Sequence, residues 1–171
     1  KYAHDASHFL YTPDVVVEAR TAHDVAAAFR ASASSGAPVV LRSGGTSLSG
    51  QAGGGGMLVD VRKHFRGVEV LDGGARVRVQ PGSTVRQVNA HLAPYGRKIG
   101  PDPASEGAAT MGGVIANNSS GMACGTKFNT YNTIESMTFV LPSGTVINTA
   151  HKDAEAQFAR EEAELVAKLE Q

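Results

Sequence analysis

The stretch PVVLRSGGTSLSG, residues 38–50, joins a short apolar run to a loop of small residues. Val39, Val40 and Leu41 predict a buried strand, because an apolar run bounded by turn residues is typical of one. In the loop that follows, successive backbone N–H groups can turn toward one point and bind an anion such as a diphosphate. The alternatives are an ordinary tight turn and, for Arg42, a solvated charge at the end of a strand.

Two familiar glycine motifs do not match this loop. Gly45 and Gly50 have the spacing of a P-loop, but Gln51 and Ala52 stand where that motif needs Lys and Ser or Thr. Nucleotide hydrolysis is therefore not expected. A dinucleotide-binding fingerprint of the Rossmann type fails as well, because its glycine spacing differs and no helix pattern follows.

Glycine is concentrated in two windows, with seven residues in 44–56 and five in 107–125 of the 20 in the chain. Both windows include apolar residues, which fits a disordered linker poorly. Before the second window, residues 101–105 (PDPAS) predict a rigid, extended loop. Residues 110–121 suit the start of a short helix facing a polar or anionic ligand. A turn at Asn117-Asn118 is the alternative. Together the two windows favour a large nucleotide cofactor.

The elements before the first loop form a strand–helix–strand unit. Val15 to Val17 predict a strand, and Thr21 with Asp24 has the spacing of a capping box at the start of a helix that reaches about Ser34. Gly36 is a natural stop for this helix. With the strand at 39–41, this unit predicts a parallel strand pair with a right-handed crossover.

Later segments predict two hairpins and two helices. The hairpins join 68–70 to 77–79 and 137–141 to 145–149, and a further strand covers 57–61. Ser83 is expected to cap a helix that ends at Pro94 to Gly96. The charged tail 153–171 has a helical period, with Phe158, Leu165 and Leu169 as its apolar positions. The predicted fold class is α+β, with a small parallel βαβ lobe and a larger, mostly antiparallel α/β lobe.

Composition excludes several classes of protein. Sixteen basic residues balance 16 acidic ones, so no nucleic-acid or anionic-membrane partner is expected. No apolar run approaches the roughly 18 residues of a membrane-spanning helix. The single cysteine, Cys124, allows no internal disulfide and is more typical of a small buried residue than of a nucleophile. The six histidines lack metal-ligand spacing. His4 and Asp5 are expected in a frayed terminus, and the alternative is that they reach the rim of the cofactor.

Residues 15–149 resemble the FAD-binding domain of the vanillyl-alcohol oxidase and p-cresol methylhydroxylase superfamily. The most similar members are the FAD-linked D-2-hydroxyacid dehydrogenases, which act on D-lactate, D-2-hydroxyglutarate or glycolate. The resemblance is carried in order by residues 38–50, 101–105 (PDPAS), 111–126 (MGGVIANNSSGMACGT) and 141–147 (LPSGTVI).

The resemblance implies a set of FAD contacts. The first loop would hold the pyrophosphate through backbone N–H groups, residues 101–105 would run beside the flavin ring and ribityl chain, and the 110–121 segment would complete the diphosphate site and line the cofactor. Gly125 and Ile147 would approach the adenine end. The predicted FAD-binding residues are Arg42, Ser43, Gly44, Gly45, Thr46, Ser47, Pro101, Asp102, Pro103, Ser105, Thr110, Gly112, Gly113, Asn117, Asn118, Gly121, Gly125 and Ile147.

The chemistry of the cofactor also follows from the resemblance. FAD would lie between the two lobes and would be bound non-covalently, because Thr46 and Ala108 stand where covalent relatives carry His or Cys. In the intact enzyme, hydride would pass from the α-carbon of a D-2-hydroxyacid to flavin N5, giving the 2-oxoacid, and electrons would pass on to an acceptor. A sugar-lactone or other alcohol oxidase on the same fold, or a non-catalytic nucleotide-binding module, is the alternative.

The sequence starts at Lys1 without a signal-like leader, and we expect it to be a piece of a longer protein. Residues 1–149 are predicted to be the FAD-binding domain, and 150–171 a helical tail leading to a missing substrate domain. In the family that domain carries the catalytic His and any metal ligands, so no catalytic or metal residue is predicted here and the chain alone is predicted to be inactive. The stretch 117–126 is similar to long bacterial members with an iron–sulfur portion, which this sequence lacks. A cytoplasmic location is expected, peripheral to the inner membrane for the full-length protein.

Overall fold

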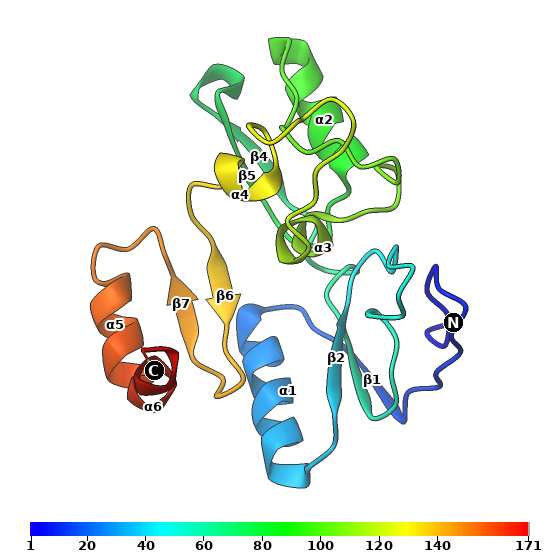
Figure 1. Ribbon diagram of the computed structural model, residues 1–171, viewed down its shortest axis with the longest axis vertical. Helices are drawn as coiled ribbons and strands as arrows, with labels where there is room; N and C mark the ends of the chain where they lie inside the picture. The colour runs from blue at the N-terminus through cyan, green and yellow to red at the C-terminus, as the bar shows by residue number, and fades with distance from the viewer. Residues whose placement is uncertain (171) are drawn as a thin grey trace. The chain divides into compact units, whose positions relative to one another are not determined.

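The computed structural model describes residues 1–170 and has the predicted mixed α+β architecture (Figure 1). Its parallel sheet contains β1 (Val15–Glu18), β2 (Val39–Arg42) and β3 (Met57–Asp60) in the order β1-β3-β2. The expected parallel pair of β1 and β2 is therefore wrong, because β3 lies between them and pairs with both. Leu58 and Val59 of β3 are completely buried, as suits a central strand of a parallel sheet.

Two antiparallel hairpins form where the sequence predicts them. The first joins β4 (Val68–Leu71) to β5 (Arg76–Val79) through a 3₁₀ turn, η1 (Asp72–Gly74), in which Gly73 and Gly74 both have positive φ. The second joins β6 (Thr138–Val140) to β7 (Val146–Asn148). Both hairpins confirm the prediction made from apolar segments on either side of glycine-containing turns.

The first helix has the predicted ends, and the second does not. Helix α1 (Ala22–Ser35) begins with the Thr21 capping box and ends at Gly36, whose φ is +72°. Helix α2 (Val85–Leu92), followed by the 3₁₀ turn η2 (Ala93–Tyr95), is capped by Thr84 instead of Ser83. The Thr84 hydroxyl accepts from Gln87 N, while the Ser83 hydroxyl donates to Gly67 O at 3.4 Å.

Four short helices complete the described chain. Helix α3 (Met111–Ala116) confirms the predicted short helix in the second glycine window, and α4 (Thr130–Thr133) has no predicted counterpart. The tail forms α5 (Ala154–Glu161) and α6 (Ala163–Leu169) instead of one continuous helix. Glu162, with φ of −125°, interrupts the helical backbone between them.

The elements divide into two compact units. The first consists of Lys1–Arg20 and Pro38–Thr133, and the second of Thr21–Ala37 and the chain from Ile134 onward. The parallel sheet thus shares a unit with β4, β5, α2 and α3, whereas α1 groups with β6, β7 and the tail. This grouping differs from the two lobes expected from the order of elements along the chain.

Each unit has its own buried side chains. In the first unit, one face of α2 packs with α3 and the β4–β5 hairpin, and its fully buried residues include Val85, Val88 and Val114. In the second unit, α1 packs against the β6–β7 hairpin and α5 packs against β7 (Figure 1). Ile147, only 2% exposed, is the largest buried side chain of that hairpin.

Candidate functional site

The loop after β2 presents a row of unpaired backbone donors. In the part of the chain that the structure describes, the N–H groups of Gly45, Thr46, Ser47 and Leu48 have no hydrogen-bond acceptor. Gly45 has φ of +67°, a left-handed conformation of the kind found in loops whose successive N–H groups face one side. Four consecutive donors on partly exposed backbone fit an anionic group, and this is the chemistry predicted for the loop.

Thr110 brings the second glycine window against this loop. Its buried hydroxyl donates to Ser43 Oγ at 2.7 Å and accepts from Gly44 N at 3.0 Å. The Ser43 hydroxyl in turn donates to Pro81 O at 3.1 Å. Any Cβ on Gly44 would lie 2.5 Å from Ala108 O, so a glycine is needed for this close approach. The structure therefore joins the two windows that the sequence assigned to one ligand.

The start of α3 offers fewer free donors than its sequence suggests. Met111 N donates to Ser83 O at 2.9 Å and Gly112 N donates to Pro81 O at 3.0 Å. Among residues 1–170, the Gly113 N–H has no acceptor, and no atom lies within 4 Å of the place a Gly113 Cβ would take. The N–H of Gly113, and not that of Gly112, is thus open to a ligand.

The proline-containing segment is shorter than the extended loop predicted for it. Glu106 N donates to Pro103 O at 2.9 Å and Ala108 N donates to Ser105 O at 2.8 Å, so the chain already turns from Pro103 onward. Pro101 is buried. The extended part is limited to the first residues of the segment, and Ser105 belongs to a turn.

Asp102 connects this segment to the loop that follows α3. Its Oδ2 accepts from Ala123 N at 3.1 Å, while its Oδ1 is buried without a hydrogen-bond partner. A Cβ on Gly121 would lie 2.1 Å from this Oδ1. The carboxylate therefore faces Gly121 and Ala123, and it orders that loop from within the protein.

Asn117 and Asn118 adopt the turn that was the alternative to ligand contact. Asn118 has φ of +44°, and its Oδ1 accepts from Tyr131 N at 3.0 Å at the start of α4. Asn117 Nδ2 donates to Ser119 Oγ at 3.3 Å. Both side chains thus have partners in the protein, as Asn residues commonly do in turns.

The remaining predicted positions, Gly125 and Ile147, differ in their surroundings. Gly125 is exposed, with φ of +54°. Ile147 belongs to the second unit, where its side chain is a core residue. Cys124 is 3% exposed, which confirms its reading as a small buried residue.

Arg42 and the first residues of the chain are bound to each other, which the sequence did not indicate. The Arg42 guanidinium donates to Ala52 O at 3.1 Å and to His4 O, and Ala6 N donates to Gly45 O at 3.0 Å. Asp5 accepts from Ser7 N at 2.8 Å; this contact, followed by Ala52 N and Arg42, holds the pKa of its carboxyl below the usual range. The alternative of a solvated Arg42 charge and the expectation of a frayed terminus are both wrong.

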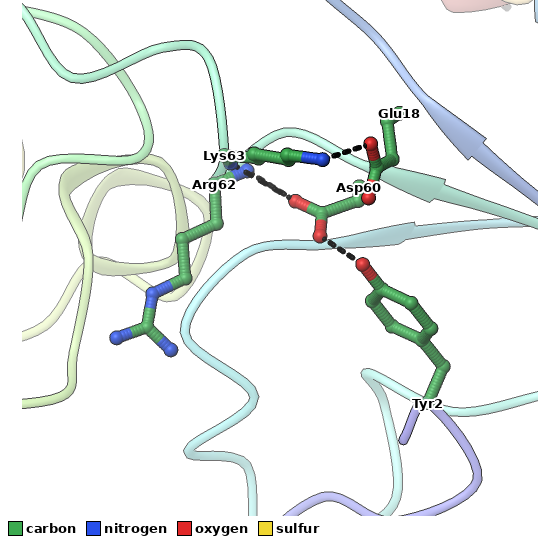
Figure 2. Close-up of polar contacts among 5 residues, drawn as sticks. All are labelled: Tyr2, Glu18, Asp60, Arg62 and Lys63. Atoms are coloured by element: carbon green, nitrogen blue, oxygen red, sulfur yellow. Dashed lines mark hydrogen bonds and ion pairs between the residues drawn. The ribbon is translucent and has the colours of Figure 1, made fainter.

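A second cluster that the sequence did not indicate surrounds Asp60 at the end of β3. Figure 2 shows its carboxylate between Tyr2 and the backbone of Arg62, whose side chain points away. The 94%-buried Asp60 accepts from Tyr2 Oη at 2.8 Å and from Arg62 N at 2.7 Å, and Lys63 pairs with Glu18 beside it. The hydrogen bond to Asp60 raises the pKa of the Tyr2 phenol to about 12. A buried carboxylate such as that of Asp60 needs hydrogen-bond partners like Tyr2 Oη and Arg62 N.

Residues 1–170 contain no group of three or more His, Cys, Asp and Glu side chains arranged to hold a metal ion. None of their helices combines the length and apolar character needed to cross a lipid bilayer.

Comparison with known proteins adds evidence that is independent of this geometry. The family described as "FAD binding domain" matches residues 13–150. D-2-hydroxyglutarate dehydrogenase of Escherichia coli is 32% identical over 149 residues, which are 85% of this chain and 15% of that protein. A mitochondrial D-lactate dehydrogenase (cytochrome) of Saccharomyces cerevisiae is 32% identical over 142 residues, 80% of this chain and 24% of that protein. The chain thus spans less than a quarter of the length of these relatives.

A solved structure agrees in fold. The crystal structure of 6-hydroxy-D-nicotine oxidase from Arthrobacter nicotinovorans superposes with a TM-score of 0.76 at 23% identity. It covers 86% of this chain, which corresponds to 32% of the oxidase.

Proposed function

The chain belongs to the FAD-binding domain family, and from this premise we propose that residues 1–149 bind FAD in a flavin-dependent oxidoreductase that oxidises a D-2-hydroxyacid to the 2-oxoacid. The family resemblance read from these sequence motifs is confirmed. The proposed substrate class follows the names of the relatives, which are dehydrogenases of D-2-hydroxyglutarate and D-lactate.

The observation that carries this proposal is the row of unpaired N–H groups from Gly45 to Leu48. FAD contains a pyrophosphate, and backbone donors are suited to hold it because they neutralise charge without requiring a flexible cationic side chain. Gly113 N–H would add a donor from the second window. The Ser43–Thr110 bond supports the proposal, since it keeps these two groups of donors in one unit.

The chain's own contribution is binding and orientation. The chemistry that FAD supplies when bound is the two-electron oxidation of the substrate. Thr46 adds a hydroxyl group next to the donor row, while the Ser47 hydroxyl donates to Gln51 Oε1 at 2.8 Å and orders the loop. Asp102, Asn117 and Asn118 support the surrounding loops through the contacts described above. Residues 101–103, Gly121, Gly125 and Ile147 stay in the proposed set as wall and adenine-end positions.

Catalytic residues are proposed to come from a substrate domain outside this chain. Helices α5 and α6, in the tail from residue 150, would lead into it. We propose non-covalent attachment of the flavin, since neither Thr46 nor Ala108 can form a bond to it. A cytoplasmic location peripheral to the inner membrane belongs to the same proposal. So does an iron–sulfur portion in a longer protein, which rests on the resemblance of residues 117–126.

The proposal is tested on the full-length protein by its spectrum and by substrate reduction. The purified protein should carry a flavin that chromatography of the released chromophore identifies as FAD. Under anaerobic conditions, D-2-hydroxyglutarate or D-lactate should bleach the flavin absorbance, and the L-enantiomers serve as matched controls. A protein that binds no flavin after incubation with FAD would overturn the proposed function. Bleaching by sugars but by neither hydroxyacid would overturn the substrate class.

The 171-residue chain alone should show no turnover with these acids and a dye acceptor. A substrate domain would provide one wall of the flavin pocket, and its loss removes apolar burial worth roughly 25 cal/mol per Å². Losing about 100 Å² would weaken FAD binding by nearly two orders of magnitude. Turnover by the chain alone at the full-length rate would contradict the placing of the catalytic residues in another domain.

A further inference from the structure

The residues before the matched family region lie against the glycine loop. The family match begins at residue 13, yet the segment Tyr2–Tyr11, here called the strap, contacts the loop at several points. Ala6 N donates to Gly45 O at 3.0 Å, and Asp5 Oδ2 accepts from Ala52 N at 3.4 Å. The strap therefore holds both the start and the end of the loop.

Aromatic rings of the strap cover two further glycines of the loop. A Cβ on Gly50 would lie 2.6 Å from Phe9 Cδ2, and a Cβ on Gly53 would lie 3.5 Å from Tyr11 Cδ2. The Phe9 and Tyr11 rings stack with their centroids 5.8 Å apart. These contacts need small residues in the loop, so the glycines serve the strap as well as a ligand.

Arg42 is the central link between the strap and the loop. One guanidinium nitrogen donates to His4 O in the strap, and the other donates to Ala52 O in the loop at 3.1 Å. A Cβ on Gly45 would lie 2.6 Å from Arg42 Nε, so the guanidinium lies directly against the first residue of the donor row. Its two donor arms are bound to carbonyl oxygens, which makes Arg42 a poor direct ligand and a strong positioning residue.

The far end of the strap is anchored separately. Tyr2 Oη donates to the buried Asp60 carboxylate at 2.8 Å (Figure 2), and Tyr11 N donates to Ala3 O at 3.1 Å, which folds the strap on itself. The strap is thus attached to the parallel sheet at one end and to the glycine loop along its middle.

We propose that the strap and Arg42 together hold the donor row from Gly45 to Leu48 in its anion-binding conformation, without themselves touching the anion. The proposal rests on the proposed FAD site. A glycine-rich loop loses much conformational entropy when it is ordered, and a loop ordered in advance binds its ligand more tightly. Arginine is suited to this position because its planar fork reaches two carbonyl oxygens at once, which the lysine ammonium does not.

The test compares variants of the full-length protein in FAD and ADP titrations, the latter because ADP carries the diphosphate without the flavin. Arg42→Gln removes the link, Arg42→Lys keeps the charge without the fork, and Ala6→Pro removes the N–H that binds Gly45 O. Arg66→Gln is the matched control, since Arg66 is exposed and its side chain makes no hydrogen bond or ion pair in the described residues. Thermal unfolding of each apo variant measures its fold separately.

The three variants at Ala6 and Arg42 should each weaken FAD and ADP binding by about tenfold or more, because each removes a hydrogen bond that orders the loop. Arg66→Gln should stay within about twofold. The double variant Ala6→Pro/Arg42→Gln should be little weaker than either single one, since both act on the same conformation.

The outcomes separate the two proposals. Wild-type protein that binds neither FAD nor ADP overturns the proposed function. If the wild-type protein binds FAD and Arg42→Lys binds it with unchanged affinity, the strap proposal alone is overturned. The strap proposal is also overturned if the losses of affinity of the two single variants add up in the double variant. Arg42→Lys provides this test even if Ala6→Pro does not fold, because it is the most conservative of the three changes.

Discussion

The hydroxyl groups of Ser43 and Thr110 lie 2.7 Å apart, although the two residues are separated by 67 positions in the sequence. The same Thr110 oxygen accepts from Gly44 N, so one buried atom organises the start of both glycine windows. A ligand site assembled from distant loops depends on links of this kind, because each loop by itself has many conformations.

Thr110→Val should destabilise the fold by about 1–3 kcal/mol. The change keeps the shape of the side chain but leaves Gly44 N–H without its acceptor and removes the Thr110 donor to Ser43 Oγ, which keeps its own bond to Pro81 O. Thr110→Ser retains the hydroxyl and is the matched control. Urea unfolding of the three proteins measures the difference. Equal midpoints for the valine and serine variants would show that the bond contributes nothing.

Gly113→Ala should leave the fold intact and weaken FAD binding on the order of tenfold. Nothing lies within 4 Å of the added methyl group, and alanine favours a helix over glycine, so apo stability should be equal or slightly higher. The methyl group would stand beside the free Gly113 N–H and obstruct a phosphate there. Gly55→Ala, whose methyl group would also meet nothing within 4 Å, is the control that should bind FAD normally. Equal FAD affinity of both variants would remove Gly113 from the proposed site.

Tyr2→Phe should lower the free energy of unfolding below pH 10, and this loss of stability should become smaller as the pH rises through about 12. The Asp60 hydrogen bond raises the pKa of the Tyr2 phenol from 10.0 to about 12, so between these values the folded chain keeps a proton that the unfolded chain has lost. Stability from this bond is therefore complete below pH 10 and is lost on going through pH 12.

The measurement is the difference in unfolding midpoint between wild type and Tyr2→Phe at pH 8, 10 and 12, which are chosen below, at the start and at the end of the shifted titration of Tyr2. A gap that stays constant across this range would contradict the raised pKa.

Acid precipitation of the flavin-loaded full-length protein should release all yellow colour into the supernatant. Thr46 and Ala108 offer no nucleophile for a bond to the flavin ring, unlike His or Cys at those places. The absorbance of supernatant and pellet is read after centrifugation. Colour that stays with the washed pellet would establish a covalent flavin.

Much of the local structure was predictable because its causes lie close together along the chain. The Thr21–Asp24 capping box, the Gly36 stop and the two hairpin turns each depend on a few neighbouring residues. The same holds for the family motifs, since backbone approach and free N–H groups require small residues in a row. The fold class and the first loop's anion-binding character could therefore be inferred from residues 38–50 and their surroundings.

Neighbouring candidates for one role were harder to tell apart. Ser83 and Thr84 are both good N-cap residues, and α2 begins at Thr84 because the Ser83 hydroxyl points to Gly67 O. The tail has one helical period, yet Glu162 interrupts it, and the Glu162 carboxylate accepts a hydrogen bond from Ser143. The contact of Ser83 with Gly67 thus leaves Thr84 as the N-cap of α2, and the contact of Ser143 with Glu162 lies at the break between the two tail helices.

By itself the sequence determined the strands, the first two helices, the α+β class and the family, because apolar periodicity, caps and glycine runs act over a few residues. Only the tertiary structure decided that β3 lies between β1 and β2, that Arg42 binds His4 and Ala52, and that Asp102 faces Gly121. The physical reason is that strand order and hydrogen-bond partners follow from burial and from which groups meet in space, and these depend on the whole fold at once.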